Sequence, residues 1–439
     1  MLRTVWLMAF AALCLAAPPH FEQSEFVAGP DGIPGGWAVW AARPEVAPRT
    51  FVDQVHSLKQ RGALAISGNS NAASYGGWEK RLEGIQSGNW YRLAASYRAE
   101  GVNYEPLQVV ARLDWVAANG QRAGQPDYAY RVAPEGPWKR LVLEAPAPEK
   151  AIAVRLQFYL ANAPQGLVWW DDVRFEEIPA PSRRPVRVAA INLRPQNTGS
   201  PARSVDEFIS AVDAAVQPGT DVILLPEGIT IVGTGKKYAE VAELVPGPTT
   251  ARLGELAKRH RAFVVAGMYE REAPAMYNTA ILVDRAGRLI GKYRKVYLPR
   301  EEIEGGLTPG NDFPVFDTDF GRVGLMICWD VQYADPARAL ALRGAELLLL
   351  PIWGGNETLA KARAIENRLF IVTSGYDFPT QILDPDGEVL SVAREQRAAA
   401  VATLDLNKRY LDPWLGDMRG RFFKELRLDL EAKHPPAYR

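Results

Sequence analysis

Gly324-Leu325-Met326-Ile327-Cys328-Trp329-Asp330 is an apolar run that reaches a cysteine and then turns polar. The pattern predicts a strand that ends where a helical segment begins, so Cys328 would lie at the carboxyl end of that strand. Ligands of open α/β folds bind at this edge of the sheet. The one other cysteine, Cys14, lies in a segment that we expect to be removed. Cys328 is therefore either a small buried hydrophobe or a nucleophile.

Strand and helix patterns alternate around this segment, from about residue 186 to residue 406. Strands are expected at 186–192, 221–226, 262–268 and 347–350. Between the first two, Ser204 and Glu207 have the spacing of a capping box at a helix start. Alternation of this kind predicts an α/β domain.

The preceding region, residues 18–178, has a different character. Short runs with period-two alternation, such as 90–97 and 107–113, are separated by Gly, Asn and Pro. Many short strands with regular turn signals predict an all-β sandwich. Residues 179–185 are Pro-rich and aperiodic, which is typical of a linker.

Residues 1–17 have the pattern of an export signal. Arg3 precedes an apolar run over 5–17, and Ala16-Ala17 offers small residues for cleavage. The run is shorter than the roughly 20 apolar residues that span a bilayer. Leu13 before Cys14 disfavours a lipoprotein. We therefore expect a periplasmic or secreted protein whose mature chain has no membrane span.

Composition excludes several classes of function. Lys plus Arg and Asp plus Glu both number 51, so the net charge is zero and gives no reason to expect nucleic-acid binding. The four histidines, His20, His56, His260 and His434, are scattered, which predicts no metal site. No glycine-rich phosphate loop follows a strand, and we expect no cofactor.

Two further polar residues follow strands or turns of the α/β domain and complement Cys328. Glu227 ends Leu224-Leu225-Pro226-Glu227, and Lys295 lies in Tyr293-Arg294-Lys295-Val296. A carboxylate can accept the proton of a thiol nucleophile, and an ammonium can stabilise the oxyanion of a tetrahedral intermediate. Taken singly, each residue has an ordinary structural explanation; together they suggest carbon–nitrogen bond hydrolysis.

With these motifs and Arg363-Ala364-Ile365-Glu366-Asn367-Arg368, residues 186–406 resemble the nitrilase, or carbon–nitrogen hydrolase, superfamily. The resemblance implies Glu227 as general base, Lys295 as oxyanion-stabilising lysine and Cys328 as nucleophile. It also implies a four-layer αββα fold that forms a homodimer, or a higher homo-oligomer, by sheet extension.

The resemblance implies a second glutamate before Thr308-Pro309-Gly310, for which Glu302 is preferred over Glu304. The backbone N–H of Trp329 is a candidate oxyanion donor. Candidate pocket residues are Gln332, Tyr333 and Trp353. No arginine lies in residues 329–333, which disfavours an N-carbamoyl amino acid and favours a neutral amide with some apolar character.

The β-sandwich resembles a jelly-roll carbohydrate-binding module, through Gly76-Gly77-Trp78-Glu79, Tyr91-Arg92-Leu93 and the closing strand at 166–175. Trp37, Trp40 and Trp78 are candidates for stacking on sugar rings. The alternative is that these side chains fill the core.

The function expected from the sequence is an exported amidase that cleaves a non-peptide linear amide through a thioester. The alternatives are an N-carbamoyl-amide or nitrile hydrolase of the same family, acyl transfer to an amine, or a glycan-binding scaffold with an inactive α/β domain. The C-terminal segment 407–439 is too apolar for disorder, and we expect it to pack on its own α/β domain or on a dimer mate.

Overall fold

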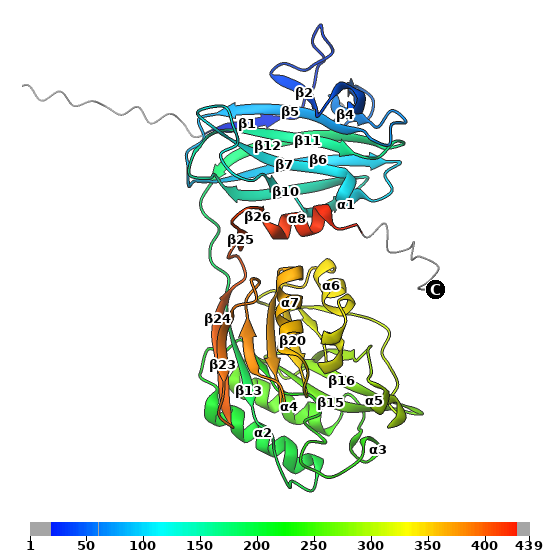
Figure 1. Ribbon diagram of the computed structural model, residues 1–439, viewed down its shortest axis with the longest axis vertical. Helices are drawn as coiled ribbons and strands as arrows, with labels where there is room; N and C mark the ends of the chain where they lie inside the picture. The colour runs from blue at the N-terminus through cyan, green and yellow to red at the C-terminus, as the bar shows by residue number, and fades with distance from the viewer. Residues whose placement is uncertain (1–18, 60, 428–439) are drawn as a thin grey trace, which may run out of the picture. The chain divides into compact units, whose positions relative to one another are not determined.

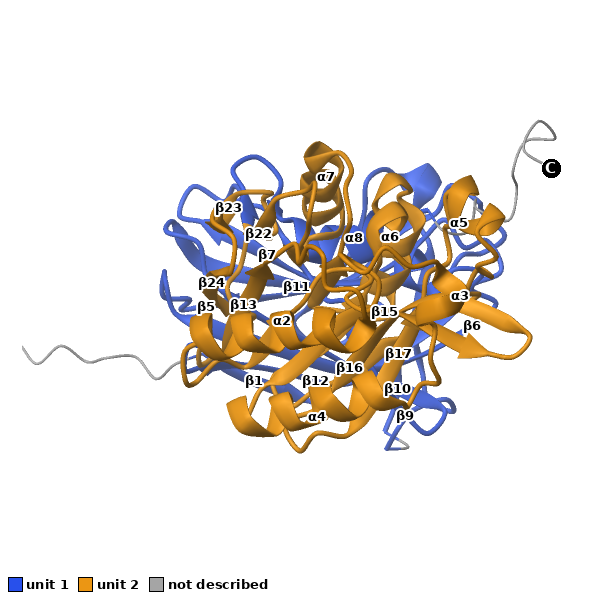
Figure 2. Cartoon of the chain, turned by 90° about the horizontal axis from the view of Figure 1, so that it is seen from below, with its two compact units in different colours: residues 1–180, 411–439 blue, residues 181–410 orange. Residues whose placement is uncertain are grey.

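The structure is a computed structural model that describes residues 19–59 and 61–427. The chain divides into two compact units, residues 1–180 with 411–439 and residues 181–410 (Figure 2). The chain therefore leaves the first unit, forms the whole of the second, and returns to the first. The expected signal segment 1–17, with Cys14, lies outside the described residues.

The first unit contains two antiparallel sheets that pack face to face around one core (Figure 1). The seven-stranded sheet has the order β3 (Arg49–Asp53), β4 (Ala63–Ser67), β12 (Leu167–Ile178), β6 (Trp90–Glu100), β10 (Trp138–Pro146) and β9 (Arg131–Glu135), with β1 (His20–Gln23) also paired to β12. The five-stranded sheet has the order β2 (Trp37–Ala41), β5 (Tyr75–Glu83), β11 (Ala151–Ala161), β7 (Val109–Ala117) and β8 (Asp127–Tyr128). Two short helical turns, η1 (Pro44–Val46) and α1 (Glu105–Gln108), lie between strands.

The three tryptophans proposed as sugar contacts have different environments. Trp78 is 1% exposed, and its indole N–H donates to the backbone oxygen of Ala65 at 3.0 Å. Trp37 is also buried in the core between the sheets. Both are therefore core residues, and their assignment as sugar contacts is wrong, because alternation along β2 and β5 turns them inward. Trp40 remains 36% exposed.

Residues 411–425 of the C-terminal segment pack on the first unit and not on the α/β domain as expected, whereas residues 407–410 belong to the second unit. It forms β25 (Leu411–Asp412), β26 (Gly416–Asp417) and α8 (Met418–Glu425). Phe423 stacks on Tyr130 with ring centroids 5.0 Å apart, and the Lys424 ammonium donates to the backbone oxygen of Val109 at 2.9 Å. Phe423 packs as the apolar composition predicted, although its partner comes from the β-sandwich, whereas Trp414 is 78% exposed.

The second unit contains two six-stranded mixed sheets. The first has the order β17 (Leu289–Arg294), β16 (Ala275–Val283), β15 (Phe263–Glu272), β14 (Val222–Leu224), β13 (Pro185–Asn192) and β24 (Ala398–Asp405). The second has the order β18 (Val315–Asp317), β19 (Arg322–Leu325), β20 (Leu347–Pro351), β21 (Phe370–Ser374), β22 (Thr380–Leu383) and β23 (Val389–Ala393). The helical segments are α2 (Pro201–Ala215), α3 (Tyr238–Val241), α4 (Pro248–His260), α5 (Arg300–Glu304), η2 (Cys328–Gln332), α6 (Asp335–Leu342) and α7 (Glu357–Asn367).

These elements form four layers. The long helices α2 and α4 cover one face of the first sheet, and the other face of that sheet packs on the second sheet through β13, β14 and β15 (Figure 1). Helix α7 contacts β21 and α6, and Leu340 of α6 packs close to Gly324 of β19. The arrangement is the αββα sandwich expected from the sequence, with β14, β20 and β21 buried at its centre.

The start of α2 differs from its prediction. The helix begins at Pro201, and the N-cap is Ser200, whose side chain accepts from the backbone N–H of Arg203. Ser204 is buried inside the helix and donates to the backbone oxygen of Val232 at 2.9 Å. Its hydroxyl therefore joins the helix to a loop of the domain and does not cap the helix.

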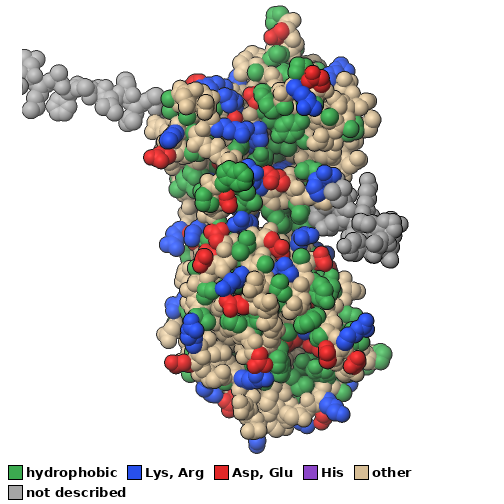
Figure 3. All heavy atoms as spheres, in the orientation of Figure 1, with side chains coloured by type: hydrophobic (Ala, Val, Ile, Leu, Met, Phe, Trp, Pro, Cys, Tyr) green, Lys and Arg blue, Asp and Glu red, His purple; other side chains and the backbone are tan. Residues whose placement is uncertain are grey.

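Charged side chains of both signs are interspersed over the face drawn in Figure 3. The pattern agrees with the balanced composition and contains no extended region of a single sign on that face. None of the helices in the described part of the chain is long and apolar enough to cross a membrane.

Candidate active site

Cys328 lies at the tight turn between β19 and η2. Its backbone has a φ of +42°, a left-handed conformation that is uncommon for a residue with a side chain. The thiol is 8% exposed, and its sulfur lies 3.6 Å from the backbone oxygen of Gly354. Strained backbone of this kind is held in place only by strong surrounding contacts, and it is frequent at functional sites.

Asp330 supplies one set of those contacts. Its fully buried carboxylate accepts from the backbone N–H of Ile327 at 2.9 Å, the backbone N–H of Tyr297 at 3.0 Å and the hydroxyl of Tyr293 at 2.7 Å. Burial raises the pKa of Asp330 to about 6, although these hydrogen bonds oppose the rise. The side chain thus ties the cysteine turn to the turn that carries Lys295.

Arg363 of α7 supports the same turn from another side. Its guanidinium donates to the backbone oxygens of Val331 and Gln332, both at 3.2 Å. Arg363 belongs to the segment 363–368, which contributed to the resemblance to the nitrilase superfamily. Its contacts show that this segment supports the backbone after Cys328. The cysteine turn is therefore held by one buried carboxylate and one buried guanidinium.

Lys295 follows β17 and is 1% exposed. Its ammonium lies 3.0 Å from the Oε1 atom of Glu227 and 2.9 Å from the Oε1 atom of Glu302. Glu227 follows β14, and Glu302 lies on α5, so three distant segments bring these charges together. Glu304, the alternative auxiliary glutamate, is exposed and outside this cluster.

Asn278 of β16 completes the cluster, and the sequence analysis missed it. Its amide nitrogen donates to Glu227 at 2.6 Å and to Glu302 at 3.0 Å. An asparagine shortly before the apolar run 280–283 was the available signal. Asn278 therefore bridges the two carboxylates, and the Lys295 ammonium contacts both of them as well.

The charges of the cluster shift the pKa values of its members. Burial alone would lower the pKa of Lys295, but Glu227, Cys328 and Glu302 raise it strongly, so the lysine stays charged. Burial and the neighbouring Glu227 raise the pKa of the Cys328 thiol to about 12, against the lowering effect of Lys295. At neutral pH the Cys328 thiol of the free enzyme is therefore protonated.

Glu302 is also affected. Burial raises the pKa of its carboxyl group, and the charge of Glu227 adds to that rise, while Lys295 and Asn278 oppose it. Two carboxyl groups that share one ammonium cannot both be ionised without a cost in free energy.

Three oxygens of this cluster are buried and accept no hydrogen bond from any residue that the structure describes: Glu227 Oε2, Glu302 Oε2 and Asn278 Oδ1. A buried acceptor without a donor costs about 1–3 kcal/mol. Such atoms are expected where a ligand brings the missing donors. The site is therefore suited to a group with N–H or O–H bonds.

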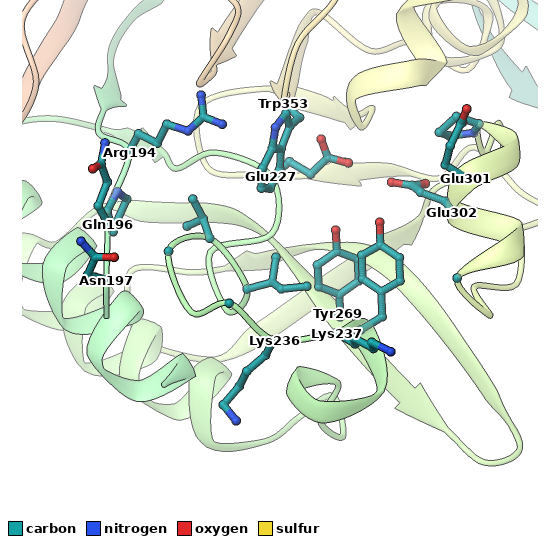
Figure 4. Close-up of a pocket in the computed structure, with 18 residues that line it drawn as sticks. Arg194, Gln196, Asn197, Glu227, Lys236, Lys237, Tyr269, Glu301, Glu302 and Trp353 are labelled. Atoms are coloured by element: carbon teal, nitrogen blue, oxygen red, sulfur yellow. The ribbon is translucent and has the colours of Figure 1, made fainter. Parts of the chain in front are cut away.

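A cavity of about 1060 Å³ reaches Glu227 and Glu302, whose carboxylates point toward one another in Figure 4. Trp353 lines this cavity, as predicted, whereas Gln332 and Tyr333 do not. Tyr333 is exposed and stacks on Tyr297 with ring centroids 4.2 Å apart. The remaining wall includes Arg194, Gln196, Asn197, Ile231, Lys236, Lys237, Tyr238 and Tyr269.

The profile of a family described as "Carbon-nitrogen hydrolase" matches residues 187–414. The chain belongs to the carbon–nitrogen hydrolase family. The match spans the α/β unit and contains Glu227, Lys295 and Cys328. A member of this family is a hydrolase that acts on carbon–nitrogen bonds other than peptide bonds, and this is the enzyme class of the protein.

Curated relatives agree with the family. The omega-amidase NIT2 of Homo sapiens is 30% identical over 278 residues, which cover 56% of this chain and 96% of the relative. A nitrilase from Pyrococcus abyssi is 33% identical over 255 residues, which cover 52% of this chain and 94% of the relative. The relatives therefore match this carbon–nitrogen hydrolase over nearly their whole length.

Among solved structures, an amidase from Nesterenkonia sp. in complex with butyramide matches with a TM-score of 0.48 and 22% sequence identity. The match covers 57% of this chain and 97% of the amidase. A Saccharomyces cerevisiae Nit3 structure matches with a TM-score of 0.46 and 24% identity, over 52% of this chain and 93% of that one.

Proposed function

We propose that the protein is an exported amidase that hydrolyses a linear, non-peptide amide through a thioester on Cys328. The observation that carries this proposal is the position of Lys295 between Glu227 and Glu302, each of which keeps one buried oxygen without a donor. The proposal assigns Glu227 as general base, Lys295 as oxyanion stabiliser and Glu302 as auxiliary carboxylate.

In the first step Glu227 removes the thiol proton while the Cys328 sulfur attacks the amide carbon. The thiol pKa of about 12 makes this transfer necessary, because almost no thiolate exists at neutral pH. The carbonyl oxygen becomes an oxyanion, which the Lys295 ammonium and the backbone N–H of Trp329 stabilise. The bond formed is sulfur to carbon, and the carbonyl π bond opens.

In the second step the tetrahedral intermediate collapses. The carbon–nitrogen bond breaks, and protonated Glu227 gives its proton to the leaving nitrogen, which departs as ammonia or an amine. Water then enters, Glu227 accepts a water proton, and hydroxide adds to the thioester carbon. Collapse of this second tetrahedral intermediate breaks the carbon–sulfur bond and releases a carboxylic acid, and protonated Glu227 returns its proton to the Cys328 sulfur.

An amide fits the cluster better than a nitrile. The amide NH₂ group brings two donors, and the unpartnered Glu227 Oε2 and Glu302 Oε2 atoms can accept them. A nitrile brings no donor and leaves both oxygens unsatisfied. We therefore expect weaker turnover of a nitrile than of the matched primary amide.

A substrate panel tests the reaction. Purified protein and its Cys328→Ala variant are incubated with small primary amides, N-carbamoyl compounds and nitriles, and ammonia release is measured. The proposal expects ammonia from amides with wild type alone, and a mass increase on Cys328 equal to the acyl group. Turnover of nitriles without turnover of amides would contradict it. Added hydroxylamine distinguishes acyl transfer, because it diverts the thioester to a hydroxamate.

The proposal includes export to the periplasm or the outside of the cell. It rests on the sequence of residues 1–17 and on the single cysteine of the remaining chain. Expression of the full chain, followed by fractionation and N-terminal sequencing of the product, tests it. An unprocessed protein in the cytoplasmic fraction would contradict it.

For the β-sandwich we propose glycan binding through Trp40, the remaining member of the three candidates. Trp40 stacks on Tyr159 with ring centroids 5.3 Å apart and meets the edge of Tyr75, so its exposed face is held rigidly. Electrophoresis through gels that contain polysaccharides tests glycan binding, and Trp40→Ala should abolish any retardation.

We also propose that the protein forms a homodimer, and sedimentation of the purified protein tests this.

A further inference from the structure

The outer face of the five-stranded sheet of the β-sandwich carries a row of polar side chains. Strand pairing places Glu79 of β5 opposite Gln157 of β11, and Gln157 opposite Arg112 of β7 (Figure 1). Tyr128 of β8 lies opposite Arg112. Trp78 points into the core between the sheets, so its neighbour Glu79 and the residues opposite Glu79 point outward. We call these four outward residues the polar row.

Hydrogen bonds connect the members of the polar row. The Arg112 guanidinium donates through Nε to the side-chain oxygen of Gln157 at 2.5 Å and through Nη1 to the Tyr128 hydroxyl at 2.9 Å. The amide nitrogen of Gln157 donates to the Glu79 carboxylate at 2.5 Å. The row is therefore a fixed network, because each side chain holds its neighbour in place.

Arg112 is a buried cation without an anionic partner. The residue is 6% exposed, and its guanidinium carbon lies 5.5 Å and 5.4 Å from the ring centroids of Tyr128 and Tyr159. Among residues 19–59 and 61–427, no carboxylate forms an ion pair with Arg112, and its Nη2 atom makes no hydrogen bond. Buried charges are normally paired, because their transfer out of water is costly. A ligand with an anionic group would supply the missing partner.

The neighbouring carboxylates already serve other groups. Asp114, on the same face of β7, accepts from Arg122 at 2.7 Å and from Arg155 at 3.0 Å, so one carboxylate is shared by two guanidiniums. Glu79 accepts at the far end of the polar row. The surroundings of Arg112 therefore keep an excess of positive charge.

An aromatic surface lies beside this cation. The half-exposed indole of Trp40 stacks on Tyr159, with ring centroids 5.3 Å apart and an angle of 18° between the rings. The residue between them across the strands is Gly77, which has no side chain and lets the two rings meet. Because Tyr159 contacts both Trp40 and Arg112, the stacking surface and the cation are adjacent.

We propose that this face binds an acidic glycan, one whose sugar residues carry carboxylates, as in a polyuronate. This inference rests on the proposed glycan binding through Trp40. A sugar ring would stack on the Trp40 indole, and a carboxylate of the glycan would accept from the Arg112 Nη2 atom. A hydrogen bond between a guanidinium and a carboxylate is charge-assisted, which makes it stronger than one to a neutral hydroxyl.

Acidic tetrasaccharides and their methyl esters form suitable pairs of ligands, because esterification removes the charge and keeps the sugar rings. Tetramers of galacturonate, mannuronate and guluronate, each with its ester, are titrated calorimetrically into the full-length protein. We expect at least one acid to bind with a Kd about tenfold or more below that of its ester at low salt, and added salt should reduce the difference.

Variants locate the binding site. Arg112→Gln should remove the preference for the acid, and Trp40→Ala should weaken binding of acid and ester alike. Arg49→Met, which removes an exposed arginine from β3 of the other sheet, is the matched control and should behave as wild type. Circular dichroism checks that each variant is folded. The comparison of acid with ester in the wild type does not depend on any variant.

The outcomes separate this inference from the proposed glycan binding. If the esters bind as tightly as the acids, if a folded Arg112→Gln keeps the preference, or if only gels with neutral polysaccharides retard the protein, the inference is wrong and glycan binding stands. Equally tight binding of a glutamate tetrapeptide would show that the face recognises an acidic peptide, which also overturns it. If no tetramer binds and no polysaccharide gel retards the protein, the proposed glycan binding itself fails.

Discussion

The Tyr293 hydroxyl donates to the buried Asp330 carboxylate at 2.7 Å. This hydrogen bond joins the turn that carries Lys295 to the turn that carries Cys328. The two functional groups come from strands of different sheets, β17 and β19, so the bond acts across the interface between the two sheets. The relative position of ammonium and sulfur therefore depends on a residue that need not touch the substrate.

Removal of that hydroxyl tests this positioning role. In Tyr293→Phe, kcat/KM should fall about tenfold, in line with the roughly 1–1.5 kcal/mol of one hydrogen bond. Tyr297→Phe is the control, because its hydroxyl bonds the more exposed Asp335 at 3.2 Å. Steady-state kinetics should show the loss in kcat with KM little changed. Equal losses in both variants would argue against the role.

The pKa of the Cys328 thiol gives a prediction about Glu227. The Glu227 charge raises that pKa and the Lys295 charge lowers it, so Glu227→Gln should lower it. We expect iodoacetamide to alkylate Cys328 with a half-maximal rate at lower pH in Glu227→Gln than in wild type, while amide hydrolysis is lost. Mass spectrometry identifies the site, and Cys328→Ala is the blank. An unchanged or higher midpoint would show that Glu227 does not act on the sulfur.

Glu302 and Glu304 provide a matched pair. Glu302 is buried against Lys295 and Asn278, whereas Glu304 is exposed. Glu302→Gln should lower kcat on the order of a hundredfold, because it removes a charge and an acceptor from the cluster. Glu304→Gln should retain activity within about twofold, as surface substitutions usually do. The reverse result would move the auxiliary role to Glu304.

Lys424 of α8 predicts a pH dependence of stability. Burial lowers the pKa of this lysine from 10.5 to about 8, so above pH 8 the folded state binds fewer protons than the unfolded state. Stability should therefore rise between pH 8 and about 10.5 relative to Lys424→Met, by up to about 3 kcal/mol. Urea unfolding of both proteins across this range measures the difference. A difference that stays constant with pH would indicate that the amine remains charged in the folded state.

The order of residue types along the chain was enough to predict the class of chemistry and the α/β domain. Glu227 and Cys328 follow the apolar strands β14 and β19, whereas Lys295 follows β17, most of which is half-buried. Those signals are local, because hydrophobic period and strand ends can be recognised within a window of several residues. The same local signals predicted the β-sandwich strands and the linker.

Folding decided the features that depend on distances between remote segments. Glu302 and Glu304 are two residues apart, and only the turn of α5 puts one against Lys295 and the other in solvent. Asn278 joined the cluster only when β16 met the segments that carry Glu227 and Glu302. The direction of each side chain, inward for Trp78 and partly outward for Trp40, likewise depends on strand register.

The C-terminal segment illustrates the physical reason. Its aromatic residues predicted burial, since apolar surface leaves water wherever a complementary surface exists. Hydrophobic attraction has no direction and does not specify a partner, so the segment alone could not identify the β-sandwich as its site. Hydrogen bonds such as that from Lys424 to Val109 are directional, and they form only after the strands that supply the acceptor are in place.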